Sequence, residues 1–154
     1  MTVAQETNTK TLQHLIKFME EHWVKGWVTQ DPELYVTGFT PDAKFADTPF
    51  TQRPTHEGIR NYFQVLLTQK DCRAGYEVVA VTGNKGISKW WAEYTVMPQK
   101  DWPSNLSKLA ESYQAIGIDV EKGNFLSQDG ILIAEFNEDG LVTKLDEWWF
   151  TQKS

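Results

Sequence analysis

The sequence predicts an α+β fold, in which a curved antiparallel sheet packs on three helices and encloses a cone-shaped pocket. The clearest indication is an apolar hairpin at residues 131–150, in which the turn sequence Asn137-Glu138-Asp139-Gly140 separates two runs of β-forming residues. A second hairpin is predicted at residues 73–96, and an amphipathic helix is predicted near the start of the chain. Helical segments that precede a run of antiparallel strands are typical of the α+β class.

The length of 154 residues predicts one domain at residues 9–154, preceded by a flexible tail at residues 1–8. The net charge of −6 disfavours nucleic acid and anionic membranes as partners, and no apolar run is long enough to span a bilayer. A single cysteine, Cys72, and a polar N-terminus without a signal-peptide pattern favour a cytoplasmic protein. No spacing of Cys and His indicates a metal site, so we expect no cofactor.

The first helix is predicted from Thr9 or Thr11 to Val28, because apolar residues recur there at three- and four-residue spacing. Its buried face comprises Leu12, Leu15, Ile16, Met19, Trp23 and Trp27. Asp31-Pro32-Glu33 has the residue types of a helix start and predicts a short second helix. A short strand at residues 43–47 then leads to a third helix, for which Thr55 is the candidate N-cap.

Residues 73–82 and 87–96 are predicted strands joined by a Gly-Asn-Lys-Gly turn. On the second of these strands, Trp91, Glu93 and Thr95 share one face, and we assign that face to the interior. Residues 98–128 then interrupt the strand pattern as an insertion that includes a helix at residues 104–116. Such an insertion is either a lid or interface element, or an addition without a role at the site.

Four segments carry a resemblance to a known family: FTPDAKFADTPF (39–50), EGIRNYF (57–63), KWWAEY (89–94) and IAEFNEDGLVTKLDEWW (133–149). In order and spacing they resemble the nuclear-transport-factor-two-like superfamily, in its SnoaL-like branch of polyketide cyclases and ketosteroid isomerases, and especially the uncharacterised bacterial members. The resemblance covers residues 11–97 and 128–151. It implies a cystatin-like cone built from a single SnoaL-like domain with an insertion at about 98–128. Thr55 departs from the family, which usually has Gly before the third helix.

The resemblance also allows a comparison with the steroid isomerases. Asp47 matches their general base, but their two oxyanion donors correspond to Trp23 and Leu132, and a supporting Tyr corresponds to Phe63. Leu and Phe donate no hydrogen bond, and loss of one oxyanion donor costs roughly 10²–10³ in rate. The resemblance therefore argues against steroid isomerase activity and leaves an acid that faces an apolar cavity.

Asp47 and Glu147 are the candidate catalytic residues. Asp47 shares a strand face with Phe45 and is either a base whose pKa burial raises, or a cap for the backbone of the following loop. Glu147 lies between Leu145 and Trp149 on a face that, in the resemblance, lines the cavity. It is either an acid with a perturbed pKa, or a structural carboxylate bonded to an Arg or to a Trp N–H of the first helix. If Asp47, Glu93 and Glu147 converge, mutual repulsion keeps at least one protonated.

The seven Trp, eight Phe and five Tyr predict an aromatic core, part of which becomes a pocket wall if the cone is incompletely filled. The binding candidates are Trp23, Trp27, Phe45, Tyr62, Phe63, Trp91, Glu93, Leu132 and Trp149. Three functions remain open. The protein is an enzyme that performs cofactor-free isomerase, cyclase or hydratase/dehydratase chemistry on a small hydrophobic molecule, a non-catalytic binder of such a molecule, or a structural dimeric domain with a filled cone.

The outer face of the sheet is also predicted to be apolar, and such a face must be covered. We expect it to carry Ile131, Ile133, Trp90, Tyr94 and Trp148. A homodimer packed through this outer sheet face is the simplest arrangement that would cover it.

Overall fold

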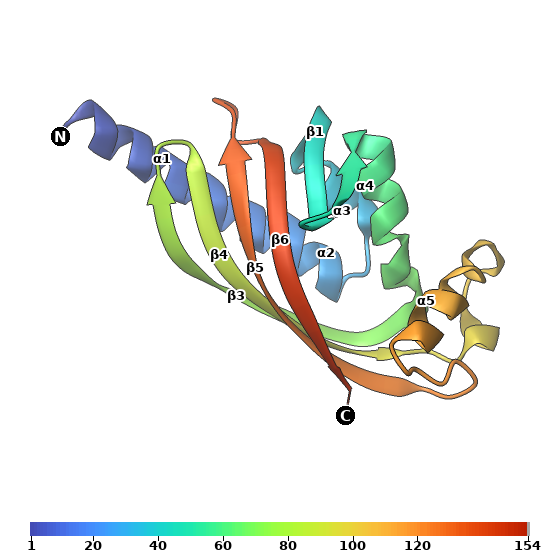
Figure 1. Ribbon diagram of the computed structural model, residues 1–154. Helices are drawn as coiled ribbons and strands as arrows, with labels where there is room; N and C mark the ends of the chain where they lie inside the picture. The colour runs from blue at the N-terminus through green and yellow to red at the C-terminus, as the bar shows by residue number, and fades with distance from the viewer. Residues whose placement is uncertain (154) are drawn as a thin grey trace.

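The computed structural model describes residues 1–153 and is built on one strongly bent sheet of six strands (Figure 1). The strands are β1 (Phe39–Thr48), β2 (Thr51–Pro54), β3 (Gln69–Thr82), β4 (Lys85–Val96), β5 (Asn124–Phe136) and β6 (Val142–Lys153). Their order across the sheet is β2-β1-β6-β5-β4-β3, and all neighbours are antiparallel except β1 and β6, which run parallel. Helices cover the inner side of the bend, so the predicted α+β class is confirmed.

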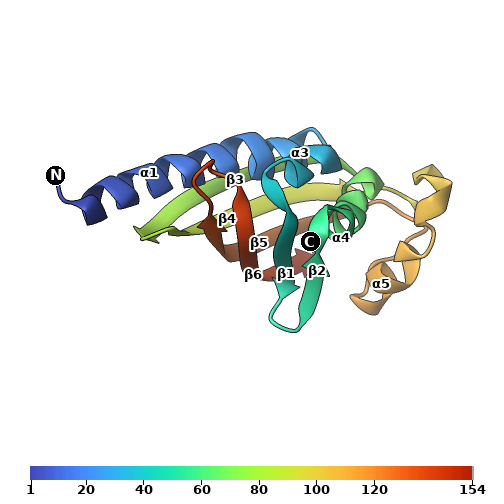
Figure 2. The ribbon, with the colours of Figure 1, turned by 90° about the horizontal axis from the view of Figure 1, so that it is seen from above.

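One long helix crosses the inner side of the sheet (Figures 1 and 2). It consists of α1 (Val3–Phe18), the π-helical segment η1 (Met19–Val24) and α2 (Lys25–Val28). The helix ends at Val28 as predicted, but it starts at Val3 rather than at Thr9 or Thr11. Thr2 and Gln5 form a capping box that satisfies first-turn N–H groups. The residues expected to form a flexible tail are therefore mostly helical.

The two short helices pack beside the end of the long one. Helix α3 (Pro32–Val36) has Asp31 as its N-cap, as the sequence predicts. The Asp31 side chain accepts a hydrogen bond from the N–H of Glu33. Helix α4 (Thr55–Phe63) continues into the 3₁₀ segment η2 (Gln64–Thr68). Thr55 does not cap α4 with its side chain, and its backbone has a φ of 67°. This residue occupies the left-handed region, which explains why glycine suits the position.

The β3–β4 and β5–β6 hairpins contain the predicted turns, but their strands are longer than expected. Strand β5 starts at Asn124, so the insertion between β4 and β5 ends near residue 123 rather than 128. The insertion contains η3 (Gln99–Asp101), η4 (Ser104–Leu106) and α5 (Leu109–Ala115). The indole of Trp102 anchors it, because its N–H donates to the carbonyl of Met97 at 2.7 Å and its ring packs 5.4 Å from that of Tyr113.

Strand β4 has the opposite inner face from the predicted one. Trp90, Ala92 and Tyr94 are buried, whereas Trp91 is 38% exposed and Glu93 forms an outward ion pair with Arg73 at 3.6 Å. Alternation correctly separates the two sets of side chains, but it does not say which set meets the core. The assignment of Trp91, Glu93 and Thr95 to the interior was therefore wrong, as was that of Trp90 and Tyr94 to the outer face.

The core is an aromatic cluster between the long helix, α3, α4 and the sheet. The rings of Tyr35 and Phe63 stack at 3.8 Å, and Trp23 packs edge-on against both. Phe45 and Leu132 are completely buried within this core. Within residues 1–153, no helix is both long and apolar enough to cross a membrane.

Candidate functional site

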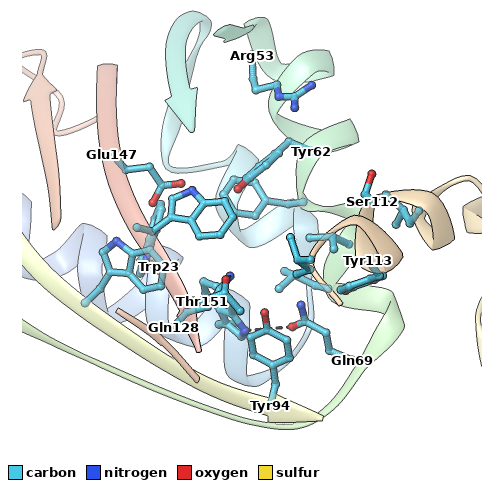
Figure 3. Close-up of a pocket in the computed structure, with 18 of the residues that line it drawn as sticks. Trp23, Arg53, Tyr62, Gln69, Tyr94, Ser112, Tyr113, Gln128, Glu147 and Thr151 are labelled. Carbon is cyan, nitrogen blue, oxygen red and sulfur yellow. Dashed lines mark hydrogen bonds between the residues drawn. The ribbon is translucent and has the colours of Figure 1, made fainter. Parts of the chain in front are cut away.

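A cavity of about 410 Å³ lies between the inner face of the sheet, α4 and the insertion (Figure 3). This volume falls within the usual range for sites that bind small molecules. Its wall is largely aromatic, with Trp23, Trp27, Tyr62, Phe63, Trp90 and Trp149 among the lining residues. The cone is therefore not packed solid.

Glu147 is the only carboxylic acid that lines the cavity among residues 1–153. Strand β6 places it there, because alternate residues of a strand share a face. Leu145 and Glu147 are buried on the inner face, while Trp148 faces outward. The side chain extends from β6 into the space beside Tyr62 and Trp23 (Figure 3). Glu147 is 2% exposed, and its Oε2 atom has no hydrogen-bond partner in the described part of the chain.

Burial raises the pKa of Glu147 well above its usual range. The negative charge of Asp47 raises this pKa further, whereas the indole N–H of Trp90 lowers it. Within the described residues, that indole nitrogen, like Glu147 Oε2, lacks a well-formed hydrogen bond. Burial therefore favours the protonated carboxyl, which can donate its proton, or a hydrogen bond, to a molecule in the cavity.

Asp47 lies next to Glu147 but does not line the cavity. In the parallel pairing of β1 with β6, Phe45 is opposite Leu145 and Ala46 is opposite Asp146, so the same register brings Asp47 beside Glu147. Asp47 is 5% exposed, and its carboxylate lies 3.5 Å from the guanidinium of Arg53. Burial raises the pKa of Asp47, but the Arg53 charge and nearby backbone N–H groups oppose this rise.

Of these two adjacent carboxyl groups, Asp47 is the one more readily ionised. It has a cation beside it and is less deeply buried, whereas Glu147 lies among aromatic rings. Such a pair keeps one acid neutral and the other charged. The arrangement corresponds to the expected repulsion between the two acids, although Glu93 lies on the other face of the sheet and takes no part.

Five of the nine predicted binding residues line the cavity, and the other four lie elsewhere. Trp23, Trp27, Tyr62, Phe63 and Trp149 line the cavity as expected. Phe45 and Leu132 support it from the core without lining it, and Trp91 and Glu93 lie on the outer face. The Trp149 indole has a second contact, because its N–H donates to the backbone carbonyl of Asp47 at 2.8 Å.

Sequence analysis missed Arg53, Trp90, Gln128 and the residues of α5. Arg53 faces Phe45 across the β1–β2 pair and lies 5.3 Å from the centre of the Tyr62 ring, at the edge of the cavity. Helix α5 contributes Ser112 and Tyr113, so the insertion does form part of the wall. The apolar spacing of Leu109 and Tyr113 was the available signal for α5, since residues four apart share a helix face.

The site has no arrangement of side chains that suggests a metal ion. Within residues 1–153, no three His, Cys, Asp or Glu side chains gather closely enough to hold one. Cys72 is buried and does not line the cavity, and burial raises its thiol pKa to about 11, so it is a poor nucleophile.

Comparisons with known proteins place these features in a family context. The family model described as the SnoaL-like domain matches residues 21–145. No curated protein sequence gives a significant match. Similar solved structures share the fold at low sequence identity, and three of them illustrate its range.

The first is the epoxide hydrolase/cyclase-like enzyme SalBIII, from pyran ring formation in the polyether salinomycin. It has a TM-score of 0.63 and 14% identity, and 92% of each chain is covered. The second is a Jannaschia sp. CCS1 protein described as a SnoaL-like polyketide cyclase, with a TM-score of 0.62, 13% identity, and coverage of 95% of this chain and 88% of the other. The third is an epoxide hydrolase of M. tuberculosis, with a TM-score of 0.56, 8% identity, and coverage of 93% and 84%.

Proposed function

Because this chain belongs to the SnoaL-like domain family, we propose that it binds a small, largely apolar molecule and performs cofactor-free acid–base chemistry on it. The observation that carries the proposal is Glu147, a buried carboxyl group that lines an aromatic cavity and has an oxygen without a hydrogen-bond partner among residues 1–153. Buried acids with strongly raised pKa values are concentrated at functional sites. The cyclase and epoxide hydrolase descriptions of the similar structures support a reaction at a substrate oxygen.

Glu147 is the proposed general acid. In its protonated form it donates its proton to a carbonyl, epoxide or leaving hydroxyl oxygen, and becomes a carboxylate. The Trp90 indole N–H lies near enough to lower the pKa of Glu147, so it stabilises this carboxylate. A proton lost from the substrate or from an attacking water restores the acid at the end of the cycle.

Asp47 keeps the predicted role of base as part of the proposal, although it lies behind the cavity wall. Its negative charge helps to hold the proton on Glu147, and Arg53 balances that charge. A base role would require the Asp47 carboxylate to reach the cavity past Arg53 and Trp149. A role confined to the electrostatics of Glu147 requires no such movement.

Non-catalytic binding is the second candidate. It is favoured by the position of Asp47, since this carboxylate lies outside the cavity and 3.5 Å from the Arg53 guanidinium. The open cavity disfavours the third alternative, a structural domain with a filled cone.

The test starts with native mass spectrometry of the purified protein, to identify a co-purifying molecule that then serves as ligand and substrate. Glu147→Gln should retain binding within a few-fold and lose turnover by at least roughly 100-fold. The matched control is Glu93→Gln, a carboxylate on the outer face, which should behave as the wild type. Undiminished turnover by Glu147→Gln would exclude the acid role.

Asp47→Asn separates the two roles of the aspartate. If Asp47 is the base, the variant loses turnover as severely as Glu147→Gln. If it acts only through its charge, the variant keeps turnover, and the alkaline limb of the pH profile moves to lower pH because the Glu147 pKa falls. Binding without any turnover by the wild type would establish the non-catalytic alternative.

A further inference from the structure

The cavity has a second polar end, which the acid–base proposal does not use. Gln128, Thr151 and Tyr94 line it on the side away from Glu147 (Figure 3). The Gln128 amide donates to the hydroxyl of Thr151 at 2.8 Å. This group lies toward the end that helix α5 of the insertion covers with Ser112 and Tyr113.

The strand register fixes the spacing between the two polar ends. Across the inner face, Leu132 pairs with Glu147, Gly130 pairs with Trp149, and Gln128 pairs with Thr151. Glu147 and Thr151 are thus four residues apart on β6, a separation of roughly 13 Å along the strand. The concave bend of the sheet brings the tips of these side chains closer together than their Cα atoms. Tyr94 on β4 pairs with Leu126, which lies two residues from Gln128 along β5.

The cross-strand set of residues between the two polar ends is apolar and presents flat aromatic rings. It contains Trp90, whose partner Gly130 leaves room for the indole, and Trp149 on the next strand. A Cβ atom built on Gly130 would lie 2.4 Å from the Trp90 ring, so only glycine allows this ring to lie against the sheet. A ligand that touches both polar ends must therefore place an apolar, preferably ring-containing, body over these indoles.

The second polar end retains hydrogen-bonding capacity. Gln128 is 9% exposed and Tyr94 is 3% exposed, yet the Gln128 amide oxygen and the Tyr94 hydroxyl form no hydrogen bond with any of residues 1–153. Buried polar groups usually have partners, because an unpaired one costs free energy. An amide and a phenol together can donate to and accept from a hydroxyl or carbonyl group of a ligand.

This end is also electrically neutral. Arg53 is the only cation among the cavity-lining residues, and it lies beside Tyr62 rather than near Gln128. Lys153 does not line the cavity, and its ammonium donates to the carbonyl of Gly117 at 2.6 Å. An anionic group placed here would lose its hydration without gaining a counter-ion.

We propose that the cavity selects elongated, neutral molecules that carry an oxygen function at each end of an apolar, ring-containing body. One oxygen meets Glu147, and the other is bound by Gln128, Thr151 and Tyr94. This inference rests on the proposed function, because it takes the same cavity as the binding site, and it adds the substrate class. Gln128 and Tyr94 are specificity-determining residues in this account.

The test compares two rigid phenols of almost equal size, para,para′-biphenol with two hydroxyls and para-phenylphenol with one. Binding is followed by quenching of tryptophan fluorescence and by calorimetry. One additional net hydrogen bond is equivalent to about five-fold in affinity. The wild type should therefore bind the diol at least about five-fold more tightly than the monophenol. An analogue with a carboxylate in place of one hydroxyl should bind at least about ten-fold more weakly than the diol.

The double variant Tyr94→Phe/Gln128→Met removes the phenol and the amide of the second polar end with little change in volume, and it leaves the Thr151 hydroxyl. It should lose most of the preference for the diol. Tyr94→Phe alone should reduce the preference for the diol and serves if the double variant does not fold. The matched control is Tyr76→Phe, since the hydroxyl of Tyr76 bonds Glu20 at 2.8 Å outside the cavity and its loss should leave the preference intact.

Equal binding of the two phenols by the wild type, or a preference that persists in the double variant, would overturn the inference and leave the proposed function standing. Tight binding of the carboxylate analogue would overturn its neutral character. If neither phenol binds the wild type, this inference fails, and the proposed function is then decided separately by the co-purifying molecule and the turnover of Glu147→Gln.

Discussion

Glu147 is the residue on which the proposed chemistry depends, and its burial has a consequence for stability. In the unfolded chain a Glu carboxyl ionises above about pH 4.3. In the folded protein the raised pKa keeps it protonated to higher pH. Between these two pKa values the folded state binds more protons than the unfolded state, so the stability of the fold decreases as pH rises through this window.

Glu147→Gln removes this proton linkage and keeps the shape of the side chain. The variant should gain stability relative to the wild type as pH rises above about 4.3, by at most about 1.4 kcal/mol for each pH unit. Urea denaturation at a series of pH values measures the difference. Glu93→Gln, on the outer face, should follow the wild-type curve. Parallel pH profiles for Glu147→Gln and the wild type would show that the acid titrates normally.

Thr55 is a second residue that affects the stability of the fold, through its backbone conformation. Its φ of 67° places a β-branched side chain in the left-handed region, which costs an L-residue roughly 1–2 kcal/mol. Thr55→Gly should therefore stabilise the protein by about 1 kcal/mol, because the relief of strain exceeds the added freedom of the unfolded chain. Thermal unfolding measures the change.

A matched control for Thr55→Gly is Thr95→Gly on β4, where the backbone φ is not positive. This substitution should destabilise the protein by roughly 1 kcal/mol, because glycine weakens a strand interior. Destabilisation by Thr55→Gly as well would mean that the threonine contributes contacts that outweigh its backbone conformation.

At the scale of elements, the π-helical segment η1 sets the direction of the tryptophans that line the cavity. Leu15, Met19, Trp23 and Trp27 are four residues apart and all buried. In a pure α-helix a step of four residues advances roughly 40° past a full turn, so such a row would drift around the helix. The wider π turn offsets this drift. The Tyr35 hydroxyl donates to the Trp23 carbonyl at 2.7 Å and so satisfies a backbone group within the segment.

The sheet contains two glycines under indole rings, one on each face. Gly130 lies under the buried Trp90, and Gly75 lies under the partly exposed Trp91. Gly130→Ala should destabilise the protein by roughly 1–3 kcal/mol and weaken ligand binding, because Trp90 is displaced within a packed interior. Gly75→Ala should cost less, since Trp91 can turn toward solvent. Equal losses in chemical denaturation would contradict this account.

At the scale of the whole molecule, the bend of the sheet creates the cavity and the insertion completes it. The long helix crosses the sheet and ends near α4, and α5 lies beyond α4 at the same end of the molecule (Figures 1 and 2). Trp27 donates to the Gln69 side chain at 3.2 Å, and Tyr113 bonds Thr68 at 2.7 Å. These bonds connect the long helix and α5 to the same stretch at the start of β3.

The outer face of the sheet carries the apolar surface for which a homodimer remains the prediction. Ile131 pairs with Trp148, and Phe150, which is 82% exposed, lies in the next outward row of β6. Contiguous exposed groups of this kind mark interaction sites. Sedimentation of the wild type should show a dimer, and Trp148→Lys/Phe150→Lys should produce a folded monomer.

The control for the dimer prediction is Val79→Lys. Val79 is an exposed apolar residue on the edge strand β3, three strands away from β6. This substitution should leave the dimer intact. A monomeric wild type at concentrations of about 100 μM would refute the prediction, because interfaces of standard size bind much more tightly.

Local patterns predicted much of the fold. The Asp31 cap, the turns of both long hairpins and the helix end at Val28 follow from residue types and spacings over a few positions. The N-terminal start was missed because the capping box of Thr2 and Gln5 precedes a polar stretch without an apolar period. Glu147 was found because alternation from Leu145 to Trp149 extends along one strand.

The remainder depended on how the strands associate. Alternation separates Trp90 from Trp91, and each indole lies over a glycine of a neighbouring strand, so the glycines do not identify the inner face. The packing of Trp23 and Trp27 of the long helix on Trp90 does. Asp47 likewise has the predicted strand position, yet its contact with Arg53 and its place behind the cavity wall follow from the β1–β2 pairing.

The sequence by itself determined the α+β class, the family resemblance and the choice of Glu147 as a candidate acid. These features are carried by periodicity and turn chemistry, which act between residues close in the chain. Only the tertiary structure decided which face of β4 points inward, that α5 forms part of the cavity wall, and that Gln128 and Tyr94 make a second polar end. These outcomes depend on register and burial between segments far apart in the chain, which no local pattern specifies.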